Sequence, residues 1–285
     1  MPGSFQYRSH LRRKAERNRK RSRRDLHDRQ MASGSPPLED DRVDPATYAA
    51  EALIEATHWW FVGRRRLFAR EIARLGIRRD ARTLDIGTST GTNLRMLRDL
   101  GYRHVTGLDF SIDAIRYCEE KRLGPVRQGD ICALPFPDAS FDLVLATDVI
   151  EHVDDDRRAL AEIARVLAPG GVVLITVPTF PSLWGAQDRI AQHKRRYRLR
   201  PLAAKIEAAG FSVISRYYFN YLLFVPIWAA RRIIDMLGIA LESEGNVNSA
   251  LLNIALRIIF EADTITASIL RPPFGVSALA IARRR

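Results

Sequence analysis

Residues 84–93 read LDIGTSTGTN, and this run decides the fold. Its first residues close an apolar β-type stretch at 82–86, and its last residues open a helical pattern at 93–100. Glycine at 87 and 91 permits a tight turn and a close approach of the backbone to a ligand. The helix start offers free N–H groups and a partial positive charge, which suit a phosphate or a carboxylate. The run therefore predicts a strand, a ligand-binding turn and a helix.

The same alternation continues on the carboxyl side of this unit. Short β-type runs are expected at 82–86, 104–109, 125–128, 141–147, 172–177, 211–219 and 275–282. Helical patterns are expected between them at 93–100, 112–122, 155–167 and 201–209. Such alternation predicts a doubly wound α/β fold, in which a seven-stranded, mostly parallel sheet has helices on both faces. Ligands in that architecture bind beyond the carboxyl ends of the strands.

Composition bounds the class of protein. The chain has 285 residues, 46% of them apolar, which is enough for one large domain with extensions. Cys118 and Cys132 make no metal-ligand pattern, so we expect no metal and reduced thiols in a cytoplasmic protein. Residues 1–24 are basic without an apolar stretch, which is unlike a secretory signal. No apolar run reaches the length of about 18 residues that a membrane span needs.

Charge is spread unevenly along the chain. Of the net charge of +12, +8 lies in residues 1–30. We interpret residues 1–45 as a disordered basic tail and linker, and residues 46–285 as the folded domain. A basic tail can bind nucleic acid or an anionic membrane, but a charge block specifies no partner, so we favour a solvated tail.

Carboxylates stand at the ends of two further expected strands. Asp109 ends the second strand, and Asp130 follows the third. An acid about twenty residues beyond the glycine-rich turn is placed to accept hydrogen bonds from ribose hydroxyls. Either residue alone could be a helix cap. Their recurrence at successive strand ends favours a nucleoside site.

Together these motifs resemble the class I, Rossmann-like S-adenosylmethionine-dependent methyltransferases. Further matches follow in order: LPF at 134–136, FDLV at 141–144, DVIEHV at 148–153 and RVLAPGG at 165–171. The chain departs from the family at Ser89, where glycine is usual. The resemblance implies an antiparallel last strand and S-adenosylmethionine as cofactor. It also implies the cofactor-binding residues Asp85, Gly87, Ser89, Gly91, Asn93, Asp109, Phe110, Asp130, Ile131 and Asp148.

Two segments resemble a bacterial subgroup of these enzymes with mostly unassigned substrates. HWWFVGRRR at 58–66 belongs to residues 46–76, which are expected to form a helical lid over the cofactor, although its tryptophans could equally be packing residues. The segment 184–197 follows the fifth strand, where substrate loops belong, although it could be a solvated basic loop. Its candidate substrate-binding residues are Trp184, Asp188, Arg196 and Tyr197.

Methyl transfer to a hydroxyl is helped by a general base, and histidine is suited to that task near neutral pH. His152 and His193 are the candidates. The expected acceptor is a small molecule or a lipid-linked compound. An RNA methyltransferase that uses the basic tail is an alternative, although the tail has little aromatic interleaving.

Two other enzyme classes fit less well. GTSTG at 87–91 also matches the nucleophile elbow of serine hydrolases, but no oxyanion-loop motif lies upstream. A nicotinamide dehydrogenase would need glycine at 89 and 92, where this chain has serine and threonine.

Residues 221–270 form an expected helical insertion before the last strand. The segment opens YLLFVPIW and turns basic at Arg231 and Arg232, a pattern suited to a helix in a membrane interface. It could instead pack internally or against a second subunit, so the oligomeric state is left open. We therefore predict a cytoplasmic protein in which residues 221–270 are a candidate for peripheral membrane contact.

Overall fold

The computed structural model describes residues 45–237 and 249–285. The expected tail at 1–44 lies outside the described residues, as does the middle of the expected insertion, 238–248. A seven-stranded sheet forms the centre, with strand order β3-β2-β1-β4-β5-β7-β6. The expected fold class is confirmed.

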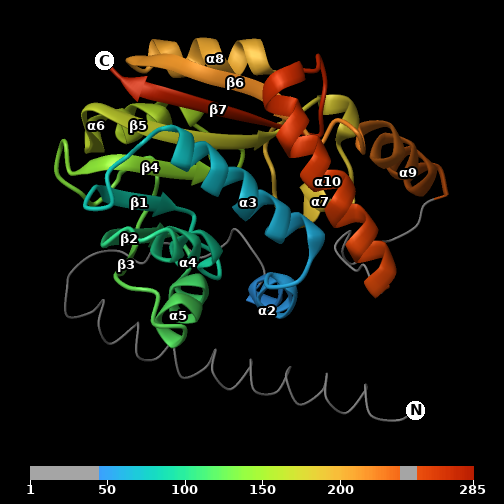
Figure 1. Ribbon diagram of the computed structural model, residues 1–285, viewed down its shortest axis with the longest axis horizontal. Coiled ribbons are helices and arrows are strands. Elements are labelled where there is room, and N and C mark those ends of the chain that lie inside the picture. Colours follow the sequence, from blue (N-terminus) through green and yellow to red (C-terminus); the bar gives the residue numbers. More distant parts are fainter. Residues whose placement is uncertain (1–44, 238–248) are drawn as a thin grey trace. The chain divides into compact units, whose positions relative to one another are not determined.

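The strands alternate with helices as the sequence predicted. Strands β1 (Arg82–Ile86), β2 (His104–Asp109), β3 (Val126–Gln128), β4 (Phe141–Thr147) and β5 (Leu167–Pro178) are mutually parallel. Strand β7 (Ser277–Arg284) runs antiparallel between β5 and β6 (Phe211–Phe219), which confirms the antiparallel last strand. The carboxyl ends of β1, β4 and β5 therefore lie along one edge of the sheet, here called its carboxyl edge. This edge faces α2 (Pro45–Ile54) and α7 (Ala186–Ile190) (Figure 1).

Strand β5 is longer than expected because it begins at Leu167 and contains a β-bulge before Val172. The pairing of β4 with β5 passes from Phe141–Leu167 directly to Leu143–Val172. The intervening Pro169-Gly170-Gly171 was expected as a turn before the strand. The strand instead begins at Leu167 and bulges there, and Gly170 takes a positive φ of 77°.

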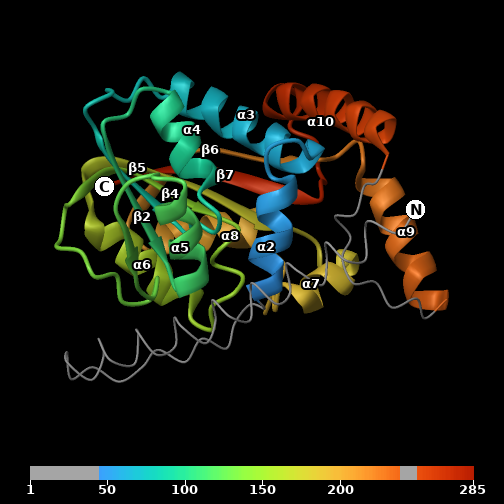
Figure 2. The same cartoon turned by 90° about the horizontal axis from the view of Figure 1, so that it is seen from below.

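Helices cover both faces of the sheet. On one face pack α3 (Trp59–Arg74), α4 (Thr92–Asp99), α5 (Ile112–Glu120) and α10 (Ala250–Leu270), through a buried cluster that includes Phe68, Leu97 and Phe260. On the other pack α6 (Asp156–Val166) and α8 (Leu199–Ala208), through Ile163, Leu202 and others. Figures 1 and 2 both show α3 beside α10.

The remaining short elements lie near the carboxyl edge of the sheet. They are α2 (Pro45–Ile54), the 3₁₀ turn η1 (Pro181–Leu183), α7 (Ala186–Ile190) and α9 (Phe224–Leu237). The expected single helical region at 221–270 thus contains α9 and α10. Among the described residues, no helix combines the length and apolar character needed to cross a membrane.

Candidate active site

The turn between β1 and α4 holds its backbone in a conformation that few side chains accept. Gly87, Ser89 and Gly91 have φ values of 70°, 48° and 89°. A Cβ on Gly91 would lie 2.3 Å from Cδ1 of Leu123, so glycine is required there for space as well as for conformation. Ser89 adopts the left-handed region without being glycine, which needs compensation from its surroundings.

Asp109 is fixed beside this turn at the end of β2. Its Oδ2 accepts a hydrogen bond of 2.8 Å from the backbone N–H of Ser89, and its Oδ1 accepts one of 2.9 Å from the backbone N–H of Ser111. The side chain therefore bridges the glycine-rich turn and the start of α5. Its expected role toward a ribose stays a prediction.

Asp85 leaves a buried oxygen without a partner just before the turn. Its Oδ1 accepts a hydrogen bond of 3.0 Å from Asn93, whose amide nitrogen also lies 3.0 Å from the Thr147 hydroxyl. No donor among the described residues forms a hydrogen bond with the buried Oδ2. Burial raises the pKa of Asp85 to about 7. A buried carboxyl with an open acceptor is suited to a hydrogen-bond donor or cation that is bound at the turn.

Three further residues that the resemblance implies for the cofactor follow β2 and β3. The Asp130 carboxylate accepts a 2.8 Å hydrogen bond from the backbone N–H of Cys132. Ile131 is buried, and the carbonyl of Phe110 accepts a 3.0 Å hydrogen bond from Gln128. Because β2 and β3 pair in parallel, all three residues follow the carboxyl ends of neighbouring strands, next to Asp109.

Helix α2 and the residue that follows it contact the turn through two carboxylates that the sequence did not single out. Glu51 accepts a 2.8 Å hydrogen bond from the Ser89 hydroxyl. Glu55 lies 2.6 Å from the Lys121 ammonium and also accepts a hydrogen bond from the Thr90 hydroxyl. The Glu51 contact supplies the compensation that a serine at position 89 needs. No spacing or motif in the sequence signals it.

Asp148, at the end of β4, is held by an arginine from α3. Its Oδ2 lies 2.5 Å from Nη2 of Arg64, and its Oδ1 accepts a 3.2 Å hydrogen bond from Thr176 of β5. The Arg64 guanidinium lies 5.4 Å from the centre of the Trp60 ring and 5.2 Å from that of Phe68. The HWWF…RRR segment thus reaches the carboxyl edge of the sheet. Arg64 belongs to that segment, but the sequence did not mark it as a site residue.

His193 and Asp188 form the best-defined polar pair at this edge. The Nδ1 atom of His193 lies 2.8 Å from Oδ1 of the fully buried Asp188. Arg196 donates two hydrogen bonds to the same carboxylate, of 2.8 and 2.9 Å, and Gly185 donates a third of 2.8 Å. Burial alone would raise the pKa of Asp188, but hydrogen bonds from His193 and Arg196 outweigh it and hold the pKa well below its usual value. An ionised Asp188 fixes a proton on Nδ1 of His193 and leaves the lone pair on Nε2.

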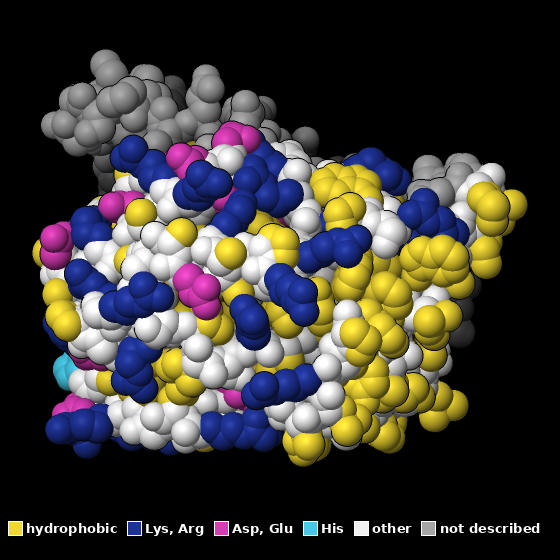
Figure 3. Space-filling view, turned by 90° about the horizontal axis from the view of Figure 1, so that it is seen from above, with side chains coloured by type: hydrophobic (Ala, Val, Ile, Leu, Met, Phe, Trp, Pro, Cys, Tyr) yellow, Lys and Arg dark blue, Asp and Glu magenta, His cyan; other side chains and the backbone are white. Residues whose placement is uncertain are grey.

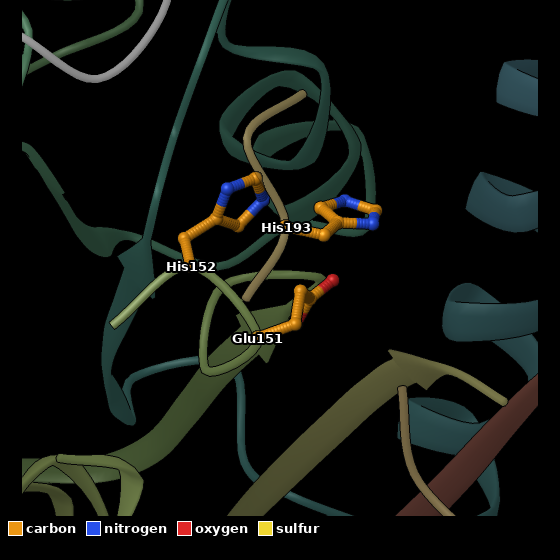
Figure 4. Close-up of side chains that lie close together, drawn as sticks. All are labelled: Glu151, His152 and His193. Carbon is orange, nitrogen blue, oxygen red and sulfur yellow. The ribbon is translucent and has the colours of Figure 1, made fainter. Parts of the chain in front are cut away.

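His152 and Glu151 lie beside His193 (Figure 4). The two imidazole centres are 4.8 Å apart at an interplanar angle of 81°. Burial, with His193 as the second cause, lowers the pKa of His152 to about 4, so its ring is neutral at pH 7. Glu151 is fully buried, and in the described part of the chain no side-chain or backbone donor is assigned to its carboxyl oxygens; burial raises its pKa well above the usual value.

The same trio is a group that could hold a metal ion. One ligand atom from each residue lies within 4.8 Å of the others. Ligand atoms around a tetrahedral zinc are separated by roughly 3.4 Å at bond lengths of about 2.1 Å. The trio would have to contract to bind an ion, and the expectation of no bound metal stays a prediction.

Of the four expected substrate-binding residues, Trp184 and Tyr197 make no hydrogen bond to His193 or Asp188 among the described residues. The Tyr197 side chain is buried, and its hydroxyl donates a 2.8 Å hydrogen bond to Asp156. Trp184 is partly buried and follows η1. Asp188 contacts His193 directly, whereas Arg196 is linked to it through the Asp188 carboxylate. Asp188 is enclosed by protein donors, which suits it to orient the histidine. The sequence identified His193 and Asp188 but not their pairing.

Comparison with known proteins points to one family. Residues 84–175 match the family model of a methyltransferase domain. A Mycolicibacterium smegmatis protein named as an S-adenosylmethionine-dependent methyltransferase is 30% identical over 62% of this chain and 66% of its own length. O-methyltransferase rstn1 of Aspergillus nomiae is 31% identical over 51% of this chain and 71% of its own. A solved Haloferax volcanii chain, named as a methyltransferase in complex with the Trm112 activator, superposes with a TM-score of 0.56 at 20% identity, covering 84% of this chain and 94% of that one.

Other curated relatives match over a smaller share. Malonyl-[acyl-carrier protein] O-methyltransferase of Pseudescherichia vulneris aligns over 57% of its length, and phosphatidylethanolamine N-methyltransferase of Cereibacter sphaeroides over 50%. The chain thus spans about half to two thirds of most of these relatives. The residues matched by the family model contain the β1–α4 turn.

Proposed function

Because the chain belongs to the class I S-adenosylmethionine-dependent methyltransferases, we propose that it transfers a methyl group to an acceptor bound at the carboxyl edge of β4 and β5. The observation that carries the proposal is the link between Asp109 and the glycine-rich turn. The hydrogen bond from Ser89 aims that carboxylate across the turn that ends β1. This arrangement joins a backbone cradle to a ribose-binding acid.

The residues present fit S-adenosylmethionine. The open Oδ2 of Asp85 can accept from the ammonium of the methionine part, directly or through water, and Asp109 can accept from the ribose hydroxyls. Gly87 and Gly91 leave room for close backbone approach. Ser89, Asn93 and Asp148 complete the methionine side, and Phe110, Asp130 and Ile131 the adenine side. When bound, the cofactor supplies an electrophilic methyl group on sulfur.

Calorimetric titration with S-adenosylmethionine tests the proposal. Asp109→Ala removes hydrogen bonds to a charged acceptor, each worth about 1.5–3 kcal/mol, so affinity should fall by one to two decades. Asp80→Ala is the control, since Asp80 pairs with Arg78 outside the site. Unchanged affinity in Asp109→Ala would remove Asp109 from the site.

His193 is proposed as the general base for an acceptor hydroxyl. With its Nδ1 proton held by Asp188, its Nε2 can take up the proton that the hydroxyl loses as its oxygen attacks the methyl carbon. His152, neutral at pH 7, is the alternative base.

A labelled-methyl assay with cell extract as the source of acceptor separates the two histidines. His193→Ala should lower incorporation by about 10²–10⁴-fold while the affinity for S-adenosylmethionine is unchanged. Normal incorporation in His193→Ala together with loss in His152→Ala would assign the base to His152.

Small-molecule and lipid-linked acceptors are favoured over RNA. Relatives named for malonyl-[acyl-carrier protein] and phosphatidylethanolamine are consistent with either favoured class. The RNA alternative rests on the basic residues at 1–30, which lie outside the described structure. Treating the labelled extract with ribonuclease, and separately extracting it into organic solvent, assigns the acceptor class. The serine hydrolase alternative loses support because the Ser89 hydroxyl donates to Glu51, whereas an elbow serine requires a histidine base.

Peripheral membrane contact through residues 221–270 is part of the proposal, for a protein placed in the cytoplasm. One side of the molecule carries a broad apolar surface (Figure 3). The outer face of α10 is apolar along its whole length, and α9 adds Trp228, which is 42% exposed. A broad, continuous apolar surface is typical of an interaction site. Its exposed large side chains include Val225, Trp228, Met236, Leu251, Ile254, Ile258, Ile265 and Ile269.

Co-sedimentation with phosphatidylcholine vesicles, with and without phosphatidylglycerol, tests membrane contact. Ile258→Glu should abolish binding, because a charge replaces an exposed apolar side chain in the centre of α10. Ile214→Glu is the matched control, since Ile214 is also exposed but lies on β6. A stable dimer that ignores every vesicle and dissociates in Ile258→Glu would assign the surface to a subunit interface instead.

A further inference from the structure

Arg231 of α9 turns inward, away from the apolar surface. Its side chain is only 10% exposed. Its Nη1 donates a hydrogen bond to the carbonyl of Leu183 and lies 3.8 Å from Oδ2 of Asp188. The sequence suggested a basic residue for a membrane interface, whereas this guanidinium reaches the carboxylate that holds His193.

The position of Asp188 makes this contact consequential. Its Oδ1 faces His193 and Nε of Arg196, and its Oδ2 faces Nη2 of Arg196, the Gly185 N–H and Arg231. Arg196 and Gly185 lie within eight residues of Asp188 in the chain, so they belong to the same loop. Arg231 comes from an element 43 residues away and ties that loop to the rest of the fold.

We propose that Arg231 is a positioning residue for His193, which makes α9 a working part of the reaction centre. The inference rests on the proposed function, in which His193 is the base. Arg231 fixes the turn at Leu183 and adds a second cation beside Oδ2, and both effects hold the Asp188 carboxylate in line with Nδ1 of His193. Because α9 also presents Trp228 to the outside, Arg231 is where the proposed membrane-contacting segment reaches the catalytic histidine.

The neighbouring arginine provides a matched control. Arg232 donates a 2.6 Å hydrogen bond to the carbonyl of Ser182, in the same 3₁₀ turn that Arg231 contacts. No ion pair joins Arg232 to Asp188 among the described residues. Arg232→Gln therefore weakens the attachment of α9 to the turn without removing charge from the His193–Asp188 pair.

Nitrogen-15 NMR of histidine-labelled protein reports on the pair without any acceptor. The chain has six histidines, and the His193 signals are assigned by their loss in His193→Gln. In the wild type, His193 should show one tautomer, with the proton on Nδ1 exchanging slowly with water. In Arg231→Gln, that proton should exchange about tenfold faster, because the cation 3.8 Å from Oδ2 of Asp188 is lost, and the second tautomer should appear. Arg231→Lys should restore much of the wild-type signature, and Arg232→Gln should leave it unchanged.

Three results would overturn the inference: an unchanged His193 signature in Arg231→Gln, equal changes in Arg231→Gln and Arg232→Gln, or no restoration by lysine. Titration with S-adenosylmethionine keeps this test apart from the proposed function. Arg231→Gln should bind the cofactor as the wild type does, which also shows that it folds. A wild-type protein that does not bind S-adenosylmethionine would refute the function while leaving the NMR result valid.

Discussion

Asp188→Asn should destabilise the folded protein strongly, although it changes only one oxygen into an amide. The carboxylate is fully buried, and the side chain of Arg196 that binds it is only 3% exposed. The substitution leaves two buried guanidinium groups, of Arg196 and Arg231, without their counter-charge. Removing one partner of a buried ion pair costs about 3–5 kcal/mol. With a urea dependence of about 2 kcal/mol per molar, the unfolding midpoint should fall by roughly 2 M.

Urea unfolding followed by circular dichroism at pH 7 measures this loss, and Asp154→Asn is the matched control. The Asp154 side chain is 82% exposed and pairs with Lys194, so its substitution should cost no more than about 1 kcal/mol. Equal midpoints for the two variants would show that Asp188 is not the buried centre of charge described above. The surviving Asp188→Asn protein should also lose the single His193 tautomer, because an amide oxygen orients the imidazole less firmly.

Three further predictions concern His152, the glycine-rich turn and the amino-terminal residues. Burial and His193 lower the pKa of His152 to about 4, so between about pH 6.5 and 4 the unfolded chain binds a proton that the folded chain does not. The free energy of unfolding should therefore fall by roughly 1–3 kcal/mol as the pH drops through that window, and His152→Gln should flatten this dependence in urea titrations. Gly91→Ala should cost at least about 2 kcal/mol and abolish cofactor binding, since its φ is 89° and the new Cβ meets Leu123; calorimetry and thermal unfolding both report it. A chain that begins at Leu38 should keep its melting temperature and its affinity for S-adenosylmethionine, and a collapse of either would move the domain boundary.

The fold was predictable because its signals are local. A buried parallel strand reads as a short apolar run, and the strands 82–86, 104–109 and 141–147 were predicted with the bounds that the structure shows. The bulge at Pro169-Gly170-Gly171 was not predicted. A proline and two glycines indicate a turn, and they give no sign that the chain pairs with β4 both before and after them. The long strand β5 is set by its partner β4, which periodicity along β5 alone does not reveal.

The candidate site was predictable where one short run of sequence carries it. Gly87 and Gly91 lie within one short run between a strand and a helix, so the sequence indicated a ligand turn there, and the family resemblance added Asp85. Contacts between distant segments left no such signal. Glu51 reaches Ser89 across 38 residues, and Arg231 reaches Asp188 across 43.

The departure at Ser89 shows why such contacts matter for reading a motif. Serine at a left-handed position is unfavourable on its own, so the sequence alone treats it as a defect in the turn. The structure gives its hydroxyl a partly buried carboxylate on α2, and burial raises the pKa of that Glu51 above its ordinary value. The hydrogen bond between the two side chains therefore offsets part of the cost of each. It follows that Ser89→Gly, although it restores the usual family residue, should not improve cofactor binding. It would remove the 2.8 Å donor of Glu51 Oε2 and leave that carboxylate with the longer 3.2 Å hydrogen bond from the Thr90 hydroxyl.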